Sequence, residues 1–294
     1  MRSRLWRKRI FVLLIAFCGV LPASAGQISA GTSPSAQSTF PYLEQWKDAV
    51  VSGNAAALKG LYSTNPPARI NPAGGGSNAD ADVAFWSGLK IRRMKVDIVQ
   101  STSPQKGLHQ VVFQIEMHTA SSQARALYVS AAQLWQQQGD QWRIVVGERS
   151  DPAKLQQPLS TKKDIYGSSI DAHTEIQQAL SGAAKEHKRV LLLFGANWCY
   201  DCHVLDLAFQ RADISAVLKR DYKVVHVDVG EGDKNQDLMS EYDVPMKRGI
   251  PAAAVLDGNG KLLVSQKNGE FEKARALGPE DLLRFLNQWK PQAR

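Results

Sequence analysis

Two cysteines separated by two residues are the strongest chemical signal in this chain. Cys199 and Cys202 lie in the run FGANWCYDCH, which begins at Phe194 and ends at His203. A pair with this spacing can close a small redox-active disulfide, supply two ligands to a metal site or, with the following histidine, attach a haem covalently. The surrounding sequence must decide among these three chemistries.

The third cysteine, Cys18, falls in an N-terminal segment with the three parts of a secretory signal. Residues 1–9 are basic, residues 10–21 are apolar, and the segment ends in Ala-Ser-Ala at Ala25. The apolar run is shorter than the roughly 20 residues that span a bilayer. Phe17 also stands before Cys18 where a lipoprotein signal has a small residue. We therefore expect cleavage of residues 1–25 and a periplasmic or secreted protein; an uncleaved anchor and an acylated Cys18 are the alternatives.

Cleavage would change both the charge and the cysteine count. The formal net charge of +8 includes five basic and no acidic residues before Ala25, so the mature chain carries about +3. No block rich in Lys and Arg remains, and we expect no nucleic-acid partner. With Cys199 and Cys202 as the remaining cysteines, the pair predicts one site and not a disulfide framework.

Two shifts in composition divide the chain. Residues 26–39 are rich in Ser, Gly, Ala and Gln and indicate a flexible leader, and residues 151–169 indicate a polar linker. The mature length exceeds one typical domain of about 100–150 residues. We therefore predict two unrelated domains, at 40–150 and 170–294.

The N-terminal half has helical spacing first and strand-like alternation afterwards. We expect helices near 42–50, 53–62 and 80–88, and strands over 94–99, 110–118, 126–136 and 142–148. This order indicates an α+β fold. Together with its ending, LWQQQGDQWRIVVGE, it resembles the cone fold of the nuclear-transport-factor and SnoaL-like proteins, a curved sheet wrapped around helices.

That superfamily includes enzymes with carboxylates in a pocket, so four acids are candidates. Acid–base chemistry needs two groups whose pKa values are pushed apart by their surroundings, and nothing in the sequence brings two acids together. We interpret each as a solvated surface residue: Asp82, Asp97, Glu116 and Glu148. Four tryptophans are expected to fill the core: Trp46, Trp86, Trp135 and Trp142. The half is predicted to be a binding, dimerisation or docking module.

The C-terminal half alternates helices and strands. We expect helices over 171–187, from Cys199 to about 218, and over 279–289, with strands over 190–194, 222–229, 252–256 and 261–265. The run at 190–194 is apolar throughout, as in a strand buried on both faces. The predicted architecture is α/β, a central mixed sheet flanked by helices.

FGANWCYDC after a buried strand, followed about 50 residues later by GIPA at 249–252, resembles thioredoxin. The resemblance covers about residues 170–291. It implies that Cys199 is the attacking thiol, that Cys202 is the resolving thiol, and that Pro251 is a cis proline packed against the disulfide.

The resemblance and simple chemistry also predict roles for Ile250 and Trp198 and explain why the Cys199 thiol would be reactive. The backbone of Ile250 would be free to pair with an extended substrate, and Trp198 would shield one side of the site. A thiolate at a helix N-terminus is stabilised by unpaired N–H groups, which lower its pKa. A purely structural disulfide that closes so small a loop would stabilise little.

Haem and zinc remain as rival chemistries. In a haem protein His203 would be the proximal ligand, with Met239 or Met246 opposite. A haem needs a pocket, whereas this motif runs from a buried strand directly into a helix, so we expect His203 to be an exposed helix residue. Zinc would need two further ligands, and there is no second cysteine pair. We therefore expect no metal or other cofactor.

Two acids and one leucine bear on the direction of electron flow. Many thioredoxins carry a buried acid six residues before the first cysteine, where this chain has Leu193; Asp201 and Asp206 are the candidates to move the proton instead. An acid beside the thiol should disfavour the thiolate, so Asp201 argues against a strong oxidant.

We therefore favour a thiol–disulfide oxidoreductase that reduces or exchanges disulfides of exported proteins, supplied by a membrane electron donor. The alternative is a non-catalytic thioredoxin-like scaffold whose N-terminal domain binds a ligand or partner. A homodimer through that domain is compatible with either.

Overall fold

The computed structural model describes residues 40–72, 75–121, 125–167, 171–245 and 247–292. The predicted signal and leader lie outside these residues, as does Met246. Within the described ranges, no helix has both the length and the apolar character that a membrane span requires.

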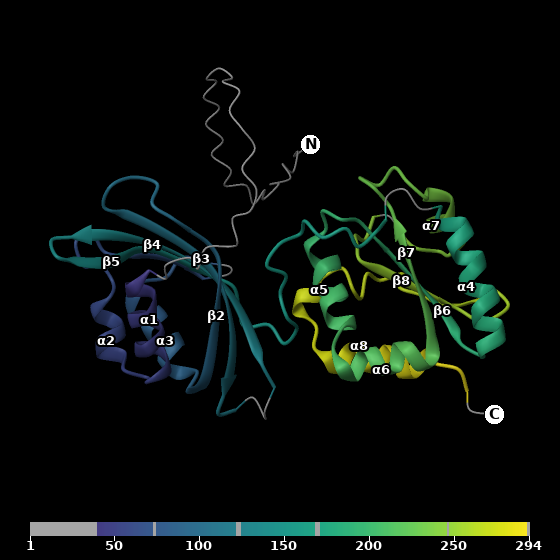
Figure 1. Cartoon of the computed structure of the whole chain (residues 1–294), viewed down its shortest axis with the longest axis horizontal. Helices are drawn as coiled ribbons and strands as arrows, with labels where there is room; N and C mark the ends of the chain where they lie inside the picture. The colour runs from purple at the N-terminus through teal and green to yellow at the C-terminus, as the bar shows by residue number, and fades with distance from the viewer. Residues whose placement is uncertain (1–39, 73–74, 122–124, 168–170, 246, 293–294) are drawn as a thin grey trace, which may run out of the picture. The chain divides into compact units, whose positions relative to one another are not determined.

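In the described part of the N-terminal half, three helices pack against a five-stranded sheet (Figure 1). The helices are α1 (Pro41–Val51), α2 (Ala55–Gly60) and α3 (Ala79–Gly88). The strands are β1 (Arg69–Pro72), β2 (Ile91–Thr102), β3 (Leu108–Thr119), β4 (Leu127–Gln138) and β5 (Gln141–Arg149). They lie in the order β1-β5-β4-β3-β2, antiparallel except for the parallel pair β1–β5. The α+β prediction is confirmed.

Alternation along the strands builds this core. Every second residue of β3 and β4 is buried, as expected of a sheet with one face against helices. Trp46, Trp86 and Trp135 are buried as predicted, whereas Trp142 is only partly buried. Strand β1 was not predicted, because a segment of four residues with one apolar side chain has no readable alternation.

Asp82 contradicts the prediction that all four acids are solvated. It is 5 % exposed and accepts hydrogen bonds from the Tyr62 hydroxyl at 2.7 Å, from Trp86 Nε1 at 3.2 Å and from Arg149 Nε at 2.7 Å. These partners offset the cost of burying a carboxylate. The cavity beside them has a volume of about 10 Å³, room for about one water molecule. The hydrogen bonds of Asp82 therefore tie α3 to Tyr62, just after α2, and to β5.

The C-terminal half has a four-stranded mixed sheet between helices (Figure 1). Its described elements are α4 (Ala172–Glu186), β6 (Arg189–Gly195), α5 (Tyr200–Phe209), α6 (Ala212–Asp221), β7 (Tyr222–Asp228), α7 (Gln236–Glu241), β8 (Ala252–Leu256), β9 (Leu262–Ser265), a 3₁₀ turn (Ala274–Ala276) and α8 (Pro279–Trp289). The strand order is β7-β6-β8-β9, with β6 and β7 parallel and the other pairs antiparallel.

Strand β6 lies in the middle of this sheet and contributes to two cores. Val190, Leu192 and Phe194 face one cluster with α4 and α7, and Leu191 and Leu193 face another with α5, α6 and α8. Burial on both faces explains why this strand is an unbroken apolar run. The predicted α/β architecture is confirmed.

Two local predictions for this half were wrong. The helix expected from Cys199 to about 218 is two helices, because Gln210 ends α5 and the backbone of Arg211 is extended. Residues 151–169, expected to form a polar linker, include side chains packed against the C-terminal half. Leu155 is fully buried in the core with α8, and Tyr166 is 3 % exposed. Helix α7 was also not anticipated, since six residues are too few for a periodic pattern.

Candidate active site

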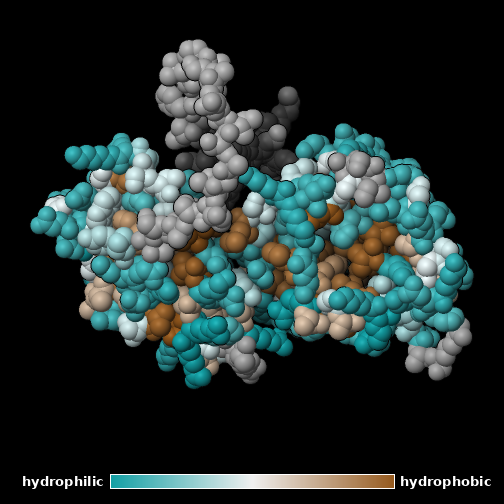
Figure 2. Space-filling model, viewed as in Figure 1, coloured by the Kyte–Doolittle hydropathy of each residue, from teal (hydrophilic) through white to brown (hydrophobic). Residues whose placement is uncertain are grey.

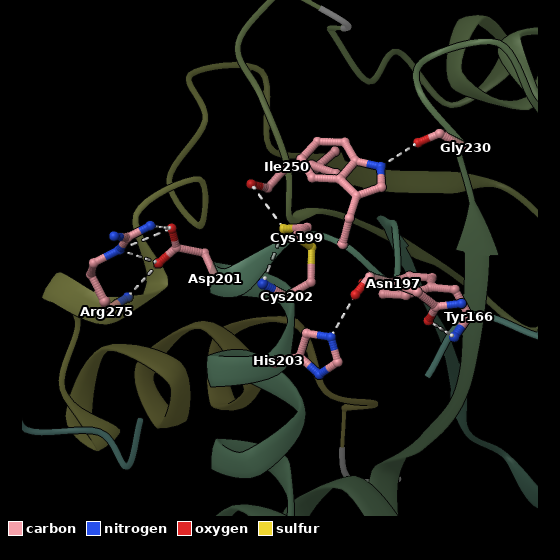
Figure 3. The surroundings of a disulfide bond; sticks show 10 residues. Tyr166, Asn197, Cys199, Asp201, Cys202, His203, Gly230, Ile250 and Arg275 are labelled. Atoms are coloured by element: carbon pink, nitrogen blue, oxygen red, sulfur yellow. Dashed lines mark hydrogen bonds and ion pairs between the residues drawn. A yellow bond between two sulfur atoms is a disulfide. The ribbon is translucent and has the colours of Figure 1, made fainter. Parts of the chain in front are cut away.

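The sulfur atoms sit where the central strand meets a helix. Strand β6 ends at Gly195, and Cys199 caps the N-terminus of α5, its Sγ accepting a hydrogen bond from the Cys202 N–H at 3.2 Å. The two cysteines form a disulfide with their Cα atoms 5.3 Å apart (Figure 3). Their exposed fractions are 4 % and 1 %. On reduction, a Cys199 thiolate would face the positive end of the helix dipole, which lowers a thiol pKa.

The loop before β8 lies against Cys199. The Ile250–Pro251 peptide bond is cis, and the Cys199 Sγ is 3.7 Å from the Ile250 carbonyl oxygen (Figure 3). Pro251 is buried, and Ile250 packs partly buried against both cysteines. The structure thus brings together the two cysteines and the loop that the sequence placed at the site.

Trp198 is an exposed aromatic side chain beside the disulfide. It is 55 % exposed, the largest fraction among the large hydrophobic side chains of the described residues. Its Nε1 donates a hydrogen bond to the Gly230 carbonyl at 3.0 Å, which anchors the indole of the residue that directly precedes Cys199. Figure 2 shows hydrophilic residues over most of the face it displays, with hydrophobic residues gathered in smaller patches. An exposed, anchored indole at this place can contact a substrate chain.

Asp201 points away from the sulfurs and towards Arg275 (Figure 3). It is 6 % exposed and accepts hydrogen bonds from the backbone N–H of Arg275 at 2.9 Å and from its Nε at 3.0 Å, with a further ion pair to Nη2. An arginine held in this way neutralises the carboxylate. The argument that Asp201 disfavours the Cys199 thiolate, and hence a strong oxidant, therefore does not hold.

His203 is buried, at 2 % exposure, and not the exposed helix residue that we expected. Its Nε2 donates a hydrogen bond to the backbone carbonyl of Asn197 at 2.7 Å (Figure 3). The imidazole therefore ties α5 to the turn before it. Met239, a proposed opposite haem ligand, is buried in the other core of the sheet, with α4 and α7. His203 and Met239 therefore do not form an axial pair for a haem.

A short segment of the supposed linker completes the site. Asn197 Oδ1 accepts hydrogen bonds from the backbone N–H groups of Ile165 and Tyr166, at 2.9 and 3.0 Å, and its Nδ2 donates to Asp164 at 2.8 Å. We call residues 164–166 the strap. Its Tyr166 ring packs in one cluster with Cys199 and Cys202. Sequence reasoning missed this segment; the signal was an aromatic residue inside a polar stretch.

The position six residues before Cys199, where many thioredoxins carry a buried acid, holds an apolar residue in this chain. Leu193 is 2 % exposed and packs in the core with α5. Asp206, one of the two candidates for proton transfer, is paired with Lys163 at 2.7 Å and with Gln210 at 2.9 Å. Both candidate acids are therefore engaged in ion pairs.

Comparison with known proteins agrees with this geometry. Residues 171–258 match a protein-family model described as thioredoxin-like. The thiol:disulfide interchange protein DsbD of Pseudomonas fluorescens is 26 % identical over 152 residues, which cover 51 % of this chain and 23 % of that protein. This chain thus spans about a quarter of that relative's length.

Similar solved structures exist for each half. A disulphide isomerase from Xylella fastidiosa Temecula1 is 35 % identical, with 43 % of this chain and 97 % of that chain covered and a TM-score of 0.42. An NTF-2-like protein of unknown function from Shewanella oneidensis MR-1 is 17 % identical, with 38 % and 94 % covered and a TM-score of 0.33. The family match, the mixed sheet and the cysteine pair at the start of α5 together establish that the C-terminal half of this chain is a thioredoxin-like domain.

Proposed function

We propose that this protein is an exported thiol–disulfide oxidoreductase that reduces or exchanges disulfides of other proteins through Cys199 and Cys202. One observation carries the proposal: the disulfide lies at a helix N-terminus, beside a cis-proline loop and an exposed indole. A disulfide that only stabilised the fold would gain little from closing so short a loop. The names of the DsbD relative and the disulphide isomerase support the same class of reaction.

In the reducing direction, the Cys199 thiolate attacks a substrate disulfide. One substrate S–S bond breaks, a mixed disulfide forms with Cys199, and the first substrate sulfur leaves as a thiolate. Cys202 then loses its proton and attacks the Cys199 sulfur, which forms the Cys199–Cys202 disulfide and releases the second substrate sulfur. Two electrons have passed to the substrate, so a donor must reduce the disulfide before the next cycle. We propose that this donor is a membrane protein.

Substrate trapping tests the proposal. The Cys202→Ser variant should accumulate mixed disulfides with exported proteins, because its attacking thiol has no resolving partner, and Cys199→Ser should not. Reducing and non-reducing gels of the two variants, made in the same exporting bacterium, give the comparison. If Cys199→Ser keeps all biological activity, the scaffold alternative is correct.

The direction of electron transfer and the export of the protein need separate measurements. A reduction potential near the strongly oxidising end, about −120 mV, would contradict the reducing direction. Export predicts a mature protein whose mass corresponds to a start at Gly26. Retention of residues 1–25 would contradict cleavage of the signal.

The outer face of the N-terminal sheet is a second candidate binding surface. A hollow of about 420 Å³ lies there, and its lining includes Pro66, Leu108, Leu134 and Val146. A large contiguous apolar patch on a protein surface can mark a protein contact. We propose that a second copy of the chain docks on this face. Light scattering should give a dimer for the native chain and a monomer for Leu134→Glu; equal masses for the two would contradict the proposal.

A further inference from the structure

The strap places a tyrosine hydroxyl close to the resolving sulfur. Tyr166 Oη lies 2.2 Å, and Cys202 Sγ 2.8 Å, from the point where a Cβ on Gly195 would stand. The two atoms are therefore at most about 5 Å apart. Both atoms occupy space that a Cβ at residue 195 would need, so glycine at this position permits their approach.

Several contacts hold the Tyr166 ring in place. The Asn197 side chain accepts hydrogen bonds from the backbone N–H groups of Ile165 and Tyr166 and donates one to the side chain of Asp164. The ring also meets His226 edge-on, with the ring centroids 5.3 Å apart. His226 stands beside Leu193 in the β6–β7 pairing. His226 thus links Tyr166 to Leu193, the position where many thioredoxins carry a buried acid.

The charged and titratable groups around the phenol favour its neutral form. Burial raises the pKa of Tyr166, and the negative charges of Asp206 and Asp228 raise it further. Burial lowers the pKa of His226, so the ring beside the phenol is neutral at pH 7. Lys163 is paired with Asp206. A phenol in this setting keeps its proton and can act as a hydrogen-bond donor.

We propose that the Tyr166 hydroxyl donates a hydrogen bond to the Cys202 thiolate in the mixed-disulfide intermediate, and so promotes the resolving step. The inference rests on the proposed exchange function of Cys199 and Cys202. In that step the Cys202 thiol loses its proton, the Cys199–Cys202 bond forms, the Cys199–substrate bond breaks, and the released substrate thiolate takes up a proton. The phenol keeps its own proton throughout.

The size of the effect follows from thiol chemistry. A hydrogen bond to a charged sulfur that shifts the Cys202 pKa by about one unit changes the thiolate fraction about tenfold below that pKa. Nucleophilicity moves the other way, by about threefold per unit, because basic thiolates attack faster. Loss of the hydroxyl should therefore slow resolution about threefold. It should leave the attack by Cys199 unchanged, because Cys199 keeps its own helix N-terminus.

Tyr166→Phe tests the proposal in the full chain. All variants carry Cys18→Ser, which leaves Cys199 and Cys202 as their cysteines. Reduced protein is mixed with oxidised glutathione, the reaction is quenched with acid at set times, and the products are measured by intact-protein mass spectrometry. The masses separate formation of the mixed disulfide from its resolution. We expect equal rates of formation and about threefold slower resolution in Tyr166→Phe. Tyr242→Phe is the matched control, a buried tyrosine in the other core of the same sheet.

A second measurement gives the cause. Thiolate absorbance near 240 nm, followed against pH in a Cys199→Ser background, should show a Cys202 pKa about one unit higher with Tyr166→Phe. Asn197→Ala, which releases the strap, should move the pKa the same way. If Tyr166→Phe resolves the mixed disulfide at the native rate and leaves the Cys202 pKa unchanged, the inference is overturned. If the native protein forms no mixed disulfide with glutathione at all, the proposed function itself fails.

Discussion

Replacing Arg275 by methionine should expose how much the Asp201 ion pair contributes to this fold. Methionine keeps much of the aliphatic packing and the backbone N–H contact to Asp201 at 2.9 Å, but removes the guanidinium. A hydrogen bond to a charged group contributes about 1.5–3 kcal/mol, and breaking a fully buried pair costs about 3–5 kcal/mol. The Arg275 side chain is 56 % exposed, so solvent screens the pair. We expect a loss of about 2 kcal/mol.

Hydrogen exchange is the suitable assay, because it reads the opening of one part of a larger chain. The slowest amides of β6 and β8 should exchange about 30-fold faster in Arg275→Met, the ratio that corresponds to about 2 kcal/mol. The neutral variant Asp201→Asn controls for the lost charge. The double variant Arg275→Met/Asp201→Asn completes the comparison. If the free-energy effects of the two substitutions were strictly additive in it, or if the amides of Arg275→Met exchanged at the native rates, the ion-pair reasoning would be refuted.

The same substitution has a redox consequence with a defined sign. Without Arg275, the Asp201 carboxylate is no longer neutralised, and a negative charge near α5 destabilises a Cys199 thiolate. The reduced state then becomes less stable relative to the disulfide, so the reduction potential should fall. Arg275→Met combined with Asp201→Asn should restore it. A higher potential in the single variant would contradict this account of the site.

Three further predictions concern other parts of the chain. Gly195→Ala would place a Cβ 2.2 Å from Tyr166 Oη, so overpacking should destabilise the protein by about 1–3 kcal/mol and lower its melting temperature; a native melting temperature would show that the strap yields freely. Glu186 forms ion pairs with Lys188 and Lys223, which lower its pKa to about 2. Any stability from this pairing is present above the unfolded pKa of about 4.5 and is lost as the pH falls towards 2; an NMR titration of Glu186 near 4.5 would contradict the pairing. Asp82→Asn should cost about 3 kcal/mol, seen as faster exchange of the β4 and β5 amides, and no change there would mean that the buried carboxylate is not the anchor.

The sequence allowed the architecture to be predicted because its signals are local. The apolar run of β6 and the CxxC spacing are read from a few neighbouring residues, as is the Ile250-Pro251 pair before β8. Alternation in β3 and β4 likewise marks an amphipathic sheet without knowledge of its partners. These features were enough to predict the fold class of each half and to single out Cys199 and Cys202 as the candidate redox pair.

The sequence did not reveal contacts between distant residues. Asp201 and Arg275 are 74 residues apart, and nothing in either neighbourhood says that one neutralises the other. Tyr166 lies in a stretch whose polarity indicates a linker, and its burial depends on Asn197, 31 residues away. His203 reads as a surface residue because its partner is a backbone carbonyl, which no sequence pattern displays. Buried polar pairing of this kind follows from tertiary structure alone.

The reduction potential of the Cys199–Cys202 couple tests the central claim most directly. Equilibration of the protein, carrying Cys18→Ser, with defined ratios of reduced and oxidised glutathione gives the value. Reversible exchange predicts a two-electron equilibrium with a potential between about −300 and −120 mV, the range of proteins that exchange disulfides. A potential below about −300 mV, at which glutathione cannot reduce the bond, is typical of a structural disulfide and would contradict the account.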